Sequence, residues 1–134
     1  MDKRQKWFFY TVLIVIFSGY VLYKWSIIVS LNQYDMLGKA SWYSKDDPGV
    51  NHRTANNEVF DDQAMTCAMW VVPFNQKIKI TNIENGRSIV CRVNDRGPHE
   101  RYFRAGRIID LTKGVFSKIG PRRRGLIRVG INFL

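Results

Sequence analysis

The sequence predicts a mainly β domain, a small barrel of about six short strands with one or two short helices, preceded by one N-terminal transmembrane helix. The helix is predicted by residues 7–23, an unbroken run with no charged residue, which is typical of a membrane span. The barrel is predicted by the rest of the chain, where short apolar segments alternate with turn residues. That part is long enough for one domain with a core, and too short for two.

The apolar N-terminal run continues beyond Lys24 to Leu31. Basic residues at positions 3, 4 and 6 precede it, so the positive-inside rule places residues 1–6 in the cytoplasm and the residues after Leu31 outside. We expect residues 7–31 to be an uncleaved signal anchor that crosses the inner (plasma) membrane once, because the run is long for a signal peptide and no small-x-small cleavage site is evident. A cleaved signal peptide and a buried core helix are the alternatives. The domain that follows would lie in the periplasm or outside the cell.

The net charge restricts the partners. The chain has 21 Lys and Arg against 11 Asp and Glu, for a formal net charge of +10, which predicts an acidic partner. Export of the domain and the lack of a base-stacking or groove-reading pattern argue against nucleic acid. The anionic polymers and lipids of a cell envelope therefore remain as expected partners.

The two cysteines, Cys67 and Cys91, both follow the predicted membrane helix. An oxidising compartment would allow them to form a disulfide, but two buried free cysteines fit the pattern equally well. Together with His52 and His99 they do not form a spacing typical of a metal site. We expect no metal and no other cofactor.

The elements of the domain follow from short periodic segments. After a polar link, strands are expected at 38–43, 77–81, 88–93, 108–111 and 126–133. The link itself is placed at residues 32–37. Asn85-Gly86 lies between two of the predicted strands and predicts a hairpin. Thr112 is expected to cap a short helix over residues 113–119, which stops at Gly120.

Asp95 is the first candidate for chemistry. It follows the strand at 88–93 and precedes Gly97-Pro98, which should end the strand and leave the carboxylate in a loop. Arg92 and Arg96 flank it, and tight pairing with either would keep it ionised. If Asp95 acts as an acid, we expect both arginines to point away from it. From these residues alone, a structural Asp–Arg turn is at least as good an interpretation.

Several short motifs then follow one another along the domain. They read GKASWY at 38–43, TANNE at 54–58 with FD at 60–61, TCAM at 66–69, PF at 73–74, TN and NGR within 81–87, NDRGP at 94–98 and RIIDL at 107–111. Together, from Gly38 to Phe133, they resemble the rare lipoprotein A (RlpA)-like family. The resemblance implies a six-stranded double-psi β-barrel over residues 38–134, as in expansins and barwin-like proteins.

The resemblance also implies an enzyme that acts on peptidoglycan. Characterised members of the family are endolytic lytic transglycosylases, which cut the β-1,4 bond between N-acetylmuramic acid and N-acetylglucosamine without water. The muramyl 6-hydroxyl attacks its own anomeric carbon and leaves a 1,6-anhydro end. Such members prefer strands stripped of stem peptides, so peptide-poor glycan is the expected partner and cell wall remodelling the expected role.

One carboxyl group can serve this reaction, first as the acid for the leaving 4-oxygen and then as the base for the 6-hydroxyl. The resemblance assigns this role to Asp95, with Glu58 as the second catalytic candidate. Each assignment has a structural alternative, such as loop capping by carboxylates and core packing by aromatic rings. The accessory candidates are His99, Arg96 and Asp110, and the glycan-binding candidates are Trp42, Tyr43, Asn56 and Trp70.

Two positions depart from the pattern of the family. Asn57 stands where the family has glycine, and because Asn tolerates a left-handed backbone we expect the loop to be kept. Met69 stands where the family has a histidine of the active-site groove, and a thioether cannot carry a proton or donate a hydrogen bond. The alternative to an enzyme is therefore a non-catalytic, expansin-like module that binds peptidoglycan without cutting it.

Overall fold

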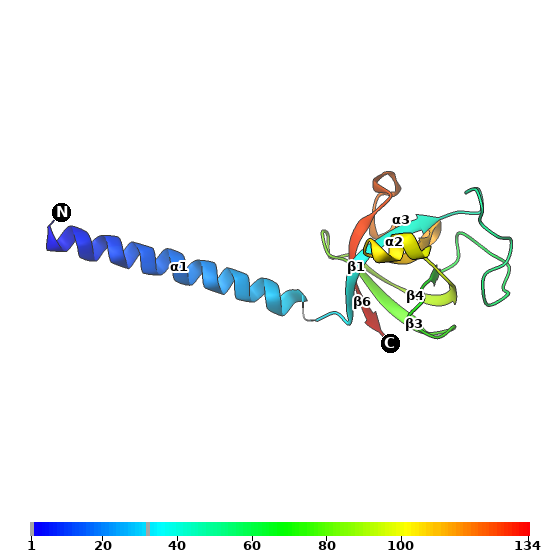
Figure 1. Cartoon of the computed structure of the whole chain (residues 1–134), viewed down its shortest axis with the longest axis horizontal. Coiled ribbons are helices and arrows are strands. Elements are labelled where there is room, and N and C mark those ends of the chain that lie inside the picture. The colour runs from blue at the N-terminus through cyan, green and yellow to red at the C-terminus, as the bar shows by residue number, and fades with distance from the viewer. Residues whose placement is uncertain (1, 32) are drawn as a thin grey trace. The chain divides into compact units, whose positions relative to one another are not determined.

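A computed structural model of the chain describes residues 2–31 and 33–134, which fall into two units, 1–33 and 34–134. The first unit is helix α1 (Lys3–Leu31), drawn in blue in Figure 1. Its residues 3–29 are long and apolar enough to cross a membrane. Apolar side chains occur on all sides of this helix and are exposed, which suits lipid better than a protein core.

The second unit is a closed barrel of six strands. The strands are β1 (Met36–Tyr43), β2 (Thr66–Ala68), β3 (Lys77–Asn82), β4 (Ser88–Asp95), β5 (Arg107–Thr112) and β6 (Ile127–Phe133). Their order around the barrel is β1-β5-β2-β4-β3-β6. The pairs β1–β5 and β2–β4 are parallel, and the other neighbours are antiparallel. The predicted six-stranded barrel is confirmed.

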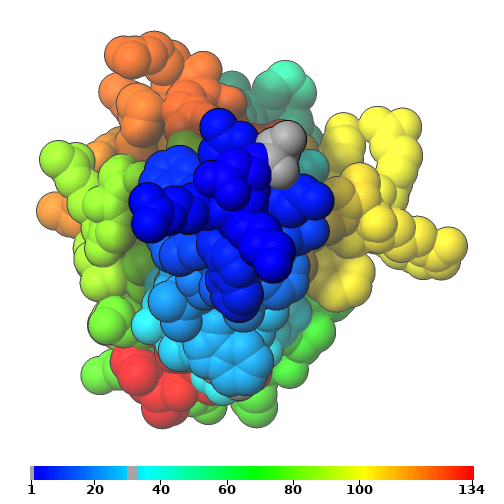
Figure 2. Space-filling model, turned by 90° about the vertical axis from the view of Figure 1, so that its left-hand side faces the viewer, coloured from blue at the N-terminus to red at the C-terminus, as the bar shows by residue number. Residues whose placement is uncertain are grey.

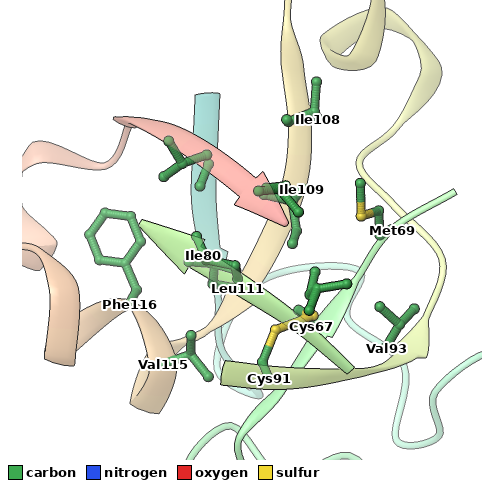
Figure 3. Packing of buried hydrophobic residues seen from close by; sticks show 14 of the residues in the cluster. Cys67, Met69, Ile80, Cys91, Val93, Ile108, Ile109, Leu111, Val115 and Phe116 are labelled. Atoms are coloured by element: carbon green, nitrogen blue, oxygen red, sulfur yellow. A yellow bond between two sulfur atoms is a disulfide. The ribbon is translucent and has the colours of Figure 1, made fainter. Parts of the chain in front are cut away.

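The barrel core is built entirely within the second unit (Figure 3). Every strand and helix α3 (Lys113–Ile119) contribute apolar side chains to it. Its largest fully buried members are Phe116, Met69, Ile78, Ile80, Ile109, Leu111, Ile119, Ile127 and Ile131. Because this core is complete without α1, the alternative that the N-terminal run is a buried core helix is wrong.

Cys67 of β2 and Cys91 of β4 form a disulfide within this core, with their Cα atoms 6.3 Å apart. The sequence is compatible either with a disulfide or with two free thiols, and the structure shows the disulfide. It joins two neighbouring strands whose ends, Ala68 and Asp95, lie at the candidate site described below. The bond therefore supports the part of the barrel that positions Asp95.

The start of the barrel differs from the sequence prediction. β1 begins at Met36 because Met36 and Leu37 pair with β6. Tyr34 also belongs to the barrel, because its ring packs against Gly130 of β6. A Cβ added to Gly130 would lie only 2.4 Å from Cγ of the Tyr34 ring. Most of the residues predicted to form a link are therefore part of the domain. Asn32, the first residue of that link, lies outside the described residues.

Two short elements were missed by the sequence analysis. β2 has only three residues, all buried, so it has no periodic pattern. Helix α2 (Glu100–Arg104) has five residues and follows a loop, where His99 Nδ1 accepts a hydrogen bond from Arg101 N. Arg122–Arg124 form a short 3-10 helix, η1. In Figure 2, α2 (yellow) and the segment around η1 (orange) project from the surface of the barrel.

Candidate active site

A cleft of about 590 Å³ opens where β1, β2 and β4 end. Tyr43, Ala68 and Asp95 are the last residues of these three strands, and all three line the cleft. Residues 48–51 and 53–55 of the loop after β1 form another wall. The other lining residues are Arg96, His99, Tyr102, Arg107 and Asp110.

Two aspartates face each other across Ala68. In the parallel pair β2–β4, Ala68 is the partner of Asp95, and in the antiparallel pair β2–β5 it is the partner of Asp110. Gly97 leaves room beside them, since a Cβ at this position would lie 3.3 Å from Asp110 Oδ2 and 3.2 Å from Ala68 Cβ. The register of the barrel thus brings together two carboxyl groups that are separated in the sequence.

The carboxylate of Asp95 is held by backbone groups. Its Oδ1 accepts hydrogen bonds from Ala55 N and Arg96 N, each at 2.8 Å. Both neighbouring arginine side chains point elsewhere, as expected for an acid. Arg92 binds Glu58, while Arg96 donates to the carbonyls of Met69 and Val72. Neither guanidinium forms an ion pair with Asp110 in the described chain.

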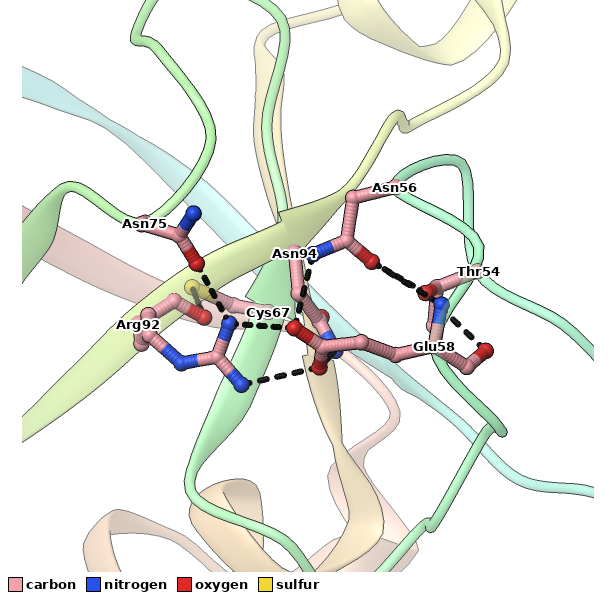
Figure 4. Close-up of polar contacts among 7 residues, drawn as sticks. All are labelled: Thr54, Asn56, Glu58, Cys67, Asn75, Arg92 and Asn94. Atoms are coloured by element: carbon pink, nitrogen blue, oxygen red, sulfur yellow. Dashed lines mark hydrogen bonds and ion pairs between the residues drawn. The ribbon is translucent and has the colours of Figure 1, made fainter.

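Arg92 holds Glu58 in a bidentate ion pair outside the cleft (Figure 4). The two N–O distances are 2.7 and 2.8 Å. Asn56 Nδ2 and Asn94 Nδ2 also donate to this carboxylate, at 2.8 and 2.9 Å. The hydrogen bonds from Arg92, Asn94 and Asn56 lower the pKa of Glu58 from 4.5 to about 2. A carboxyl group with so low a pKa is a poor proton donor at neutral pH.

The network around Glu58 serves instead to fasten a loop. Glu58 and Asn56 belong to the loop after β1, whereas Arg92 and Asn94 belong to β4, the strand that ends at Asp95. Asn57 between them has a φ of 71°, the left-handed conformation expected at this position. The same loop supplies the Ala55 N–H that binds Asp95. Glu58 therefore fits a positioning role better than that of an acid.

Replacing Glu58 by Gln should change how stability depends on pH. The pKa of Glu58 lies at about 2 in the folded chain, below its ordinary 4.5, so its stabilising contribution is present above pH 4.5 and is lost as the pH falls toward 2. In urea unfolding between those pH values, we expect the free energy of unfolding to fall less steeply for Glu58→Gln than for the native chain. Glu100→Gln is the matched surface control. Equal slopes for Glu58→Gln and the native chain would refute the proposed ion pair.

Tyr43 places a phenol in the wall of the cleft. Its ring stacks on Phe60, with centroids 4.8 Å apart, and its hydroxyl is buried without a regular hydrogen bond to any described residue. Burial, and then the nearby charges of Asp95 and Asp110, raise the pKa of Tyr43. The phenol therefore stays protonated and remains available as a donor in the cleft.

Asp110 differs from Asp95 in its surroundings. Burial raises the pKa of Asp110, against the opposing effects of a hydrogen bond from Ser41 Oγ and of Arg107, whose Nη1 lies 3.7 Å from Oδ1. Asp110 thus both lines the cleft and pairs with Arg107. Its place in the cleft fits the accessory role expected of Asp110, and its pairing with Arg107 gives it a structural role as well.

The remaining predicted residues are divided between the cleft and other places. His99 lines the cleft. Trp42 donates from Nε1 to Arg122 O, and Trp70, which is 52% exposed, donates from Nε1 to Pro98 O. Neither residue is among those that line the cleft. Met69 is fully buried in the barrel core, and its side chain therefore does not occupy the groove expected for the histidine that it replaces.

Some lining groups were not found from the sequence. Arg107 and Arg53 face the cleft, and the Ala55 N–H binds Asp95. Arg107 stands three residues before Asp110 in the RIIDL motif, a spacing that could have drawn attention to it. A backbone N–H leaves no trace in a sequence, so Ala55 could not have been found. Among residues 2–31 and 33–134, no group of three His, Cys, Asp or Glu could hold a metal.

Comparison with known proteins agrees with this architecture. The profile of the family described as "Lytic transglycolase" matches residues 35–131. The protein named endolytic peptidoglycan transglycosylase RlpA of Vibrio cholerae is 45% identical over 97 residues, which are 72% of this chain and 35% of that protein. A Synechocystis protein named as a probable enzyme of the same kind is 43% identical over 98 residues, or 72% and 28% of the two chains. The chain thus spans about a third of the length of these curated relatives.

Solved structures support the fold. A mutant expansin of Clavibacter michiganensis in complex with cellohexaose has a TM-score of 0.52 at 17% identity, over 74% of this chain and 50% of that one. The apo form of the expansin gives 0.53 at 16% identity, over 73% and 49%. These similarities, with the family match over nearly the whole second unit, confirm the predicted double-psi barrel. The chain belongs to the lytic transglycolase family of double-psi β-barrels.

Proposed function

We propose that this chain is an endolytic peptidoglycan lytic transglycosylase, which cuts the bond between N-acetylmuramic acid and N-acetylglucosamine and leaves 1,6-anhydro ends. One observation carries the proposal. Asp95 lies in an open cleft with its Oδ1 bound by two backbone N–H groups and no arginine paired with it among the described residues. Two relatives named for the same activity, 43% and 45% identical to this chain over 98 and 97 residues, support the proposal.

In the proposed mechanism Asp95 acts twice. The protonated carboxyl first gives its proton to the leaving 4-oxygen, as the glycosidic bond breaks and positive charge develops at the muramyl anomeric carbon. The resulting carboxylate then takes the proton of the muramyl 6-hydroxyl, whose oxygen forms the new bond to that carbon. Since both backbone hydrogen bonds end on Oδ1, Oδ2 is the oxygen that we assign to proton transfer. No water is consumed.

We assign Tyr43 as the hydrogen-bond donor that Met69 cannot be. Its buried hydroxyl and the carboxyl group of Asp95 belong to the same cleft. A phenol that stays protonated can donate to the Asp95 carboxylate formed after the first proton transfer. Asp110, across Ala68, supplies a second acidic group beside the developing positive charge.

Tyr43→Phe should slow glycan cleavage without unfolding the barrel. The ring and its stacking on Phe60 are kept, and only the hydroxyl is lost. Because hydrogen bonds to charged groups are worth about 1.5–3 kcal/mol, we expect the rate of release of anhydro products to fall about ten- to one-hundred-fold. Tyr34→Phe, outside the cleft, is the matched control. A native rate in Tyr43→Phe would remove this residue from the mechanism.

A second candidate function is peptidoglycan binding without cleavage. It is favoured by Met69, which leaves the site without the imidazole of the family and is buried in the core. In that case the cleft would hold a glycan strand and Asp95 would only accept hydrogen bonds from its hydroxyl groups. The two functions differ in their products, because only the enzyme creates new chain ends.

We also propose that α1 anchors the barrel to the inner membrane, with the barrel on the outer side. The length and apolar character of residues 3–29 and the basic residues at positions 3, 4 and 6 support this arrangement. The short segment between α1 and β1 would then favour glycan near the membrane surface. An uncleaved chain in the membrane fraction, with the barrel open to added protease only from the outer side, is the expected result.

A digest tests the proposed function. The full chain, in a non-ionic detergent, is incubated with intact sacculi and with peptide-free glycan strands, and the soluble products are examined by mass spectrometry. Fragments with 1,6-anhydromuramyl ends are the expected products. If the protein sediments with the glycan but releases no fragments, the binding module is correct and the enzyme is not.

A further inference from the structure

Three cations lie together on the outer surface of the barrel, where β6 has β1 and β3 as its neighbours (Figure 1). Lys39 of β1 and Arg128 of β6 are direct partners in the antiparallel pair, and Lys79 belongs to β3. All three are exposed, and none forms an ion pair with any residue that the structure describes. The acidic residue closest to Lys39 in sequence, Asp35, already accepts a hydrogen bond from Phe133 N. Because like charges directly opposite each other destabilise a sheet, this arrangement favours an anionic partner.

An aromatic and an aliphatic side chain adjoin the cations. Arg128 and Gly130 are two residues apart on β6 and face the same, outer side of the sheet, while Val129 between them is fully buried. The ring of Tyr34 packs on this outer side of Gly130. Leu37, the partner of Gly130 on β1, is 44% exposed. We call the five residues of this surface the basic face: Tyr34, Leu37, Lys39, Lys79 and Arg128.

Very little chain joins the basic face to α1. The helix ends at Leu31, and Tyr34 is already packed on the barrel. Three Cα–Cα steps of about 3.8 Å each separate these residues, so the Cα atom of Tyr34 lies within roughly 11 Å of that of Leu31. If α1 spans a membrane, the basic face is therefore held close to the headgroups of that membrane.

We propose that the basic face docks on anionic lipid headgroups at the outer surface of the membrane that α1 spans, an inference that rests on the anchor proposed above. Lys and Arg side chains are attracted to anionic headgroups. Tyr34 suits the same boundary, because a ring with a polar end is stabilised where one side is apolar and the other is wet. Leu37 adds an apolar contact beside it.

Docking leaves the cleft free for a glycan strand. None of the five residues of the basic face lines the cleft. β1 runs for eight residues, about 23 Å, from Met36 beside Tyr34 to Tyr43 in the wall of the cleft. A docked barrel would thus keep Asp95 at a set distance from the end of α1, instead of turning freely on its short tether. The inference adds an orientation to the proposed anchor.

Labelling of lysines in nanodiscs tests the proposal. The full chain is incorporated at low ionic strength into discs of phosphatidylcholine and into discs of phosphatidylcholine and phosphatidylglycerol in equal parts, and is treated briefly with an amine-reactive reagent. Mass spectrometry gives the labelling rate of each lysine, with the exposed Lys45 as the reference. We expect the anionic lipid to slow the labelling of Lys39 and Lys79 at least about five-fold relative to Lys45. Added salt should remove this protection, because it screens the charges.

Removal of two charges identifies the face. In Lys39→Gln with Arg128→Gln, Lys79 remains as the reporter, and its labelling in anionic discs should return to within about two-fold of its rate in neutral discs. Arg101→Gln with Lys118→Gln removes the same charge from exposed positions on α2 and α3 and should keep the protection of Lys79. Protection that survives the first double variant, or that both double variants lose equally, would overturn the proposal.

The outcomes also separate this inference from its basis and from a rival. A chain that co-purifies with neither kind of disc would refute the anchor, and the docking with it. A chain that co-purifies with both, but whose Lys39 and Lys79 are labelled equally fast in both, would keep the anchor and refute the docking alone. Soluble peptidoglycan fragments are the rival anionic partner. If they protect these lysines in neutral discs while anionic lipid does not, the face binds glycan and the proposal is wrong. Because no cleavage is needed, the digest and this experiment can fail independently.

Discussion

Asp95→Asn is expected to abolish glycan cleavage while leaving the folded barrel and its glycan binding intact. Asn keeps an oxygen for the hydrogen bonds from Ala55 N and Arg96 N, so the loop geometry should survive. It cannot deliver or take the proton that the reaction moves. General acid–base groups contribute about 10²–10⁴-fold to rates, and release of anhydro products should fall by at least that range, as followed by mass spectrometry over time.

Two other variants show whether the loss is specific to Asp95. Asp61→Asn, an exposed carboxylate outside the cleft, is the matched control and should cleave at the native rate. Asp110→Asn should lower the rate less than Asp95→Asn, because Asp110 is assigned no proton transfer. Should Asp110→Asn prove inactive and Asp95→Asn active, the roles of the two aspartates are reversed.

Loss of the Cys67–Cys91 disulfide is expected to cost about 3.5 kcal/mol of the free energy of unfolding. The bond joins residues 24 apart in the sequence, and a cross-link of that span restricts the unfolded chain by about this amount. Two buried core positions also lose their sulfur atoms when both become Ala. Urea unfolding of Cys67→Ala with Cys91→Ala, followed by circular dichroism, should therefore show a clearly lower midpoint than the native chain.

A reducing agent provides the control for this result. Reduction should lower the unfolding midpoint of the native chain toward that of the double variant, which has no disulfide to lose and should not respond. Identical midpoints for the native chain with and without reductant would mean that the disulfide does not stabilise the barrel. We expect cleavage by the double variant to fall as well at temperatures where it begins to unfold, since β2 and β4 carry Ala68 and Asp95.

Local signals in the sequence were sufficient for most elements. Asn85-Gly86 predicts the β3–β4 hairpin because Gly86 needs a positive φ, and Thr112 predicts the start of α3 because its hydroxyl can accept from Val115 N. β2 escaped prediction because three buried residues between loops have no pattern of their own. Its existence depends on pairing with β4 and β5, which is a property of the closed barrel.

Only part of the site could be predicted, because some of its contacts, like strand β2, depend on the closed barrel. The motifs identified Asp95, Asp110, His99 and Tyr43, all of which line the cleft. Side-chain partners between distant segments could not be predicted, and the pairing of Glu58 with Arg92, 34 residues away, changes the expected role of Glu58. The sequence also does not show on which face of β1 each aromatic residue lies. Trp42 and Tyr43 have the same aromatic character, and only the register of the strand places Tyr43 in the cleft and Trp42 in a different hollow.

Digestion in water enriched in heavy oxygen is the most direct test of the central claim. The claim is that Asp95 drives cleavage through the muramyl 6-hydroxyl although Met69 replaces the histidine. The full native chain and Asp95→Asn are incubated with glycan strands in this water, and the new chain ends are weighed. The account predicts 1,6-anhydro ends without heavy oxygen from the native chain and none from the variant. Ends labelled with heavy oxygen would reveal a hydrolase, and intact strands that still bind the native protein would show that the barrel does not cleave glycan.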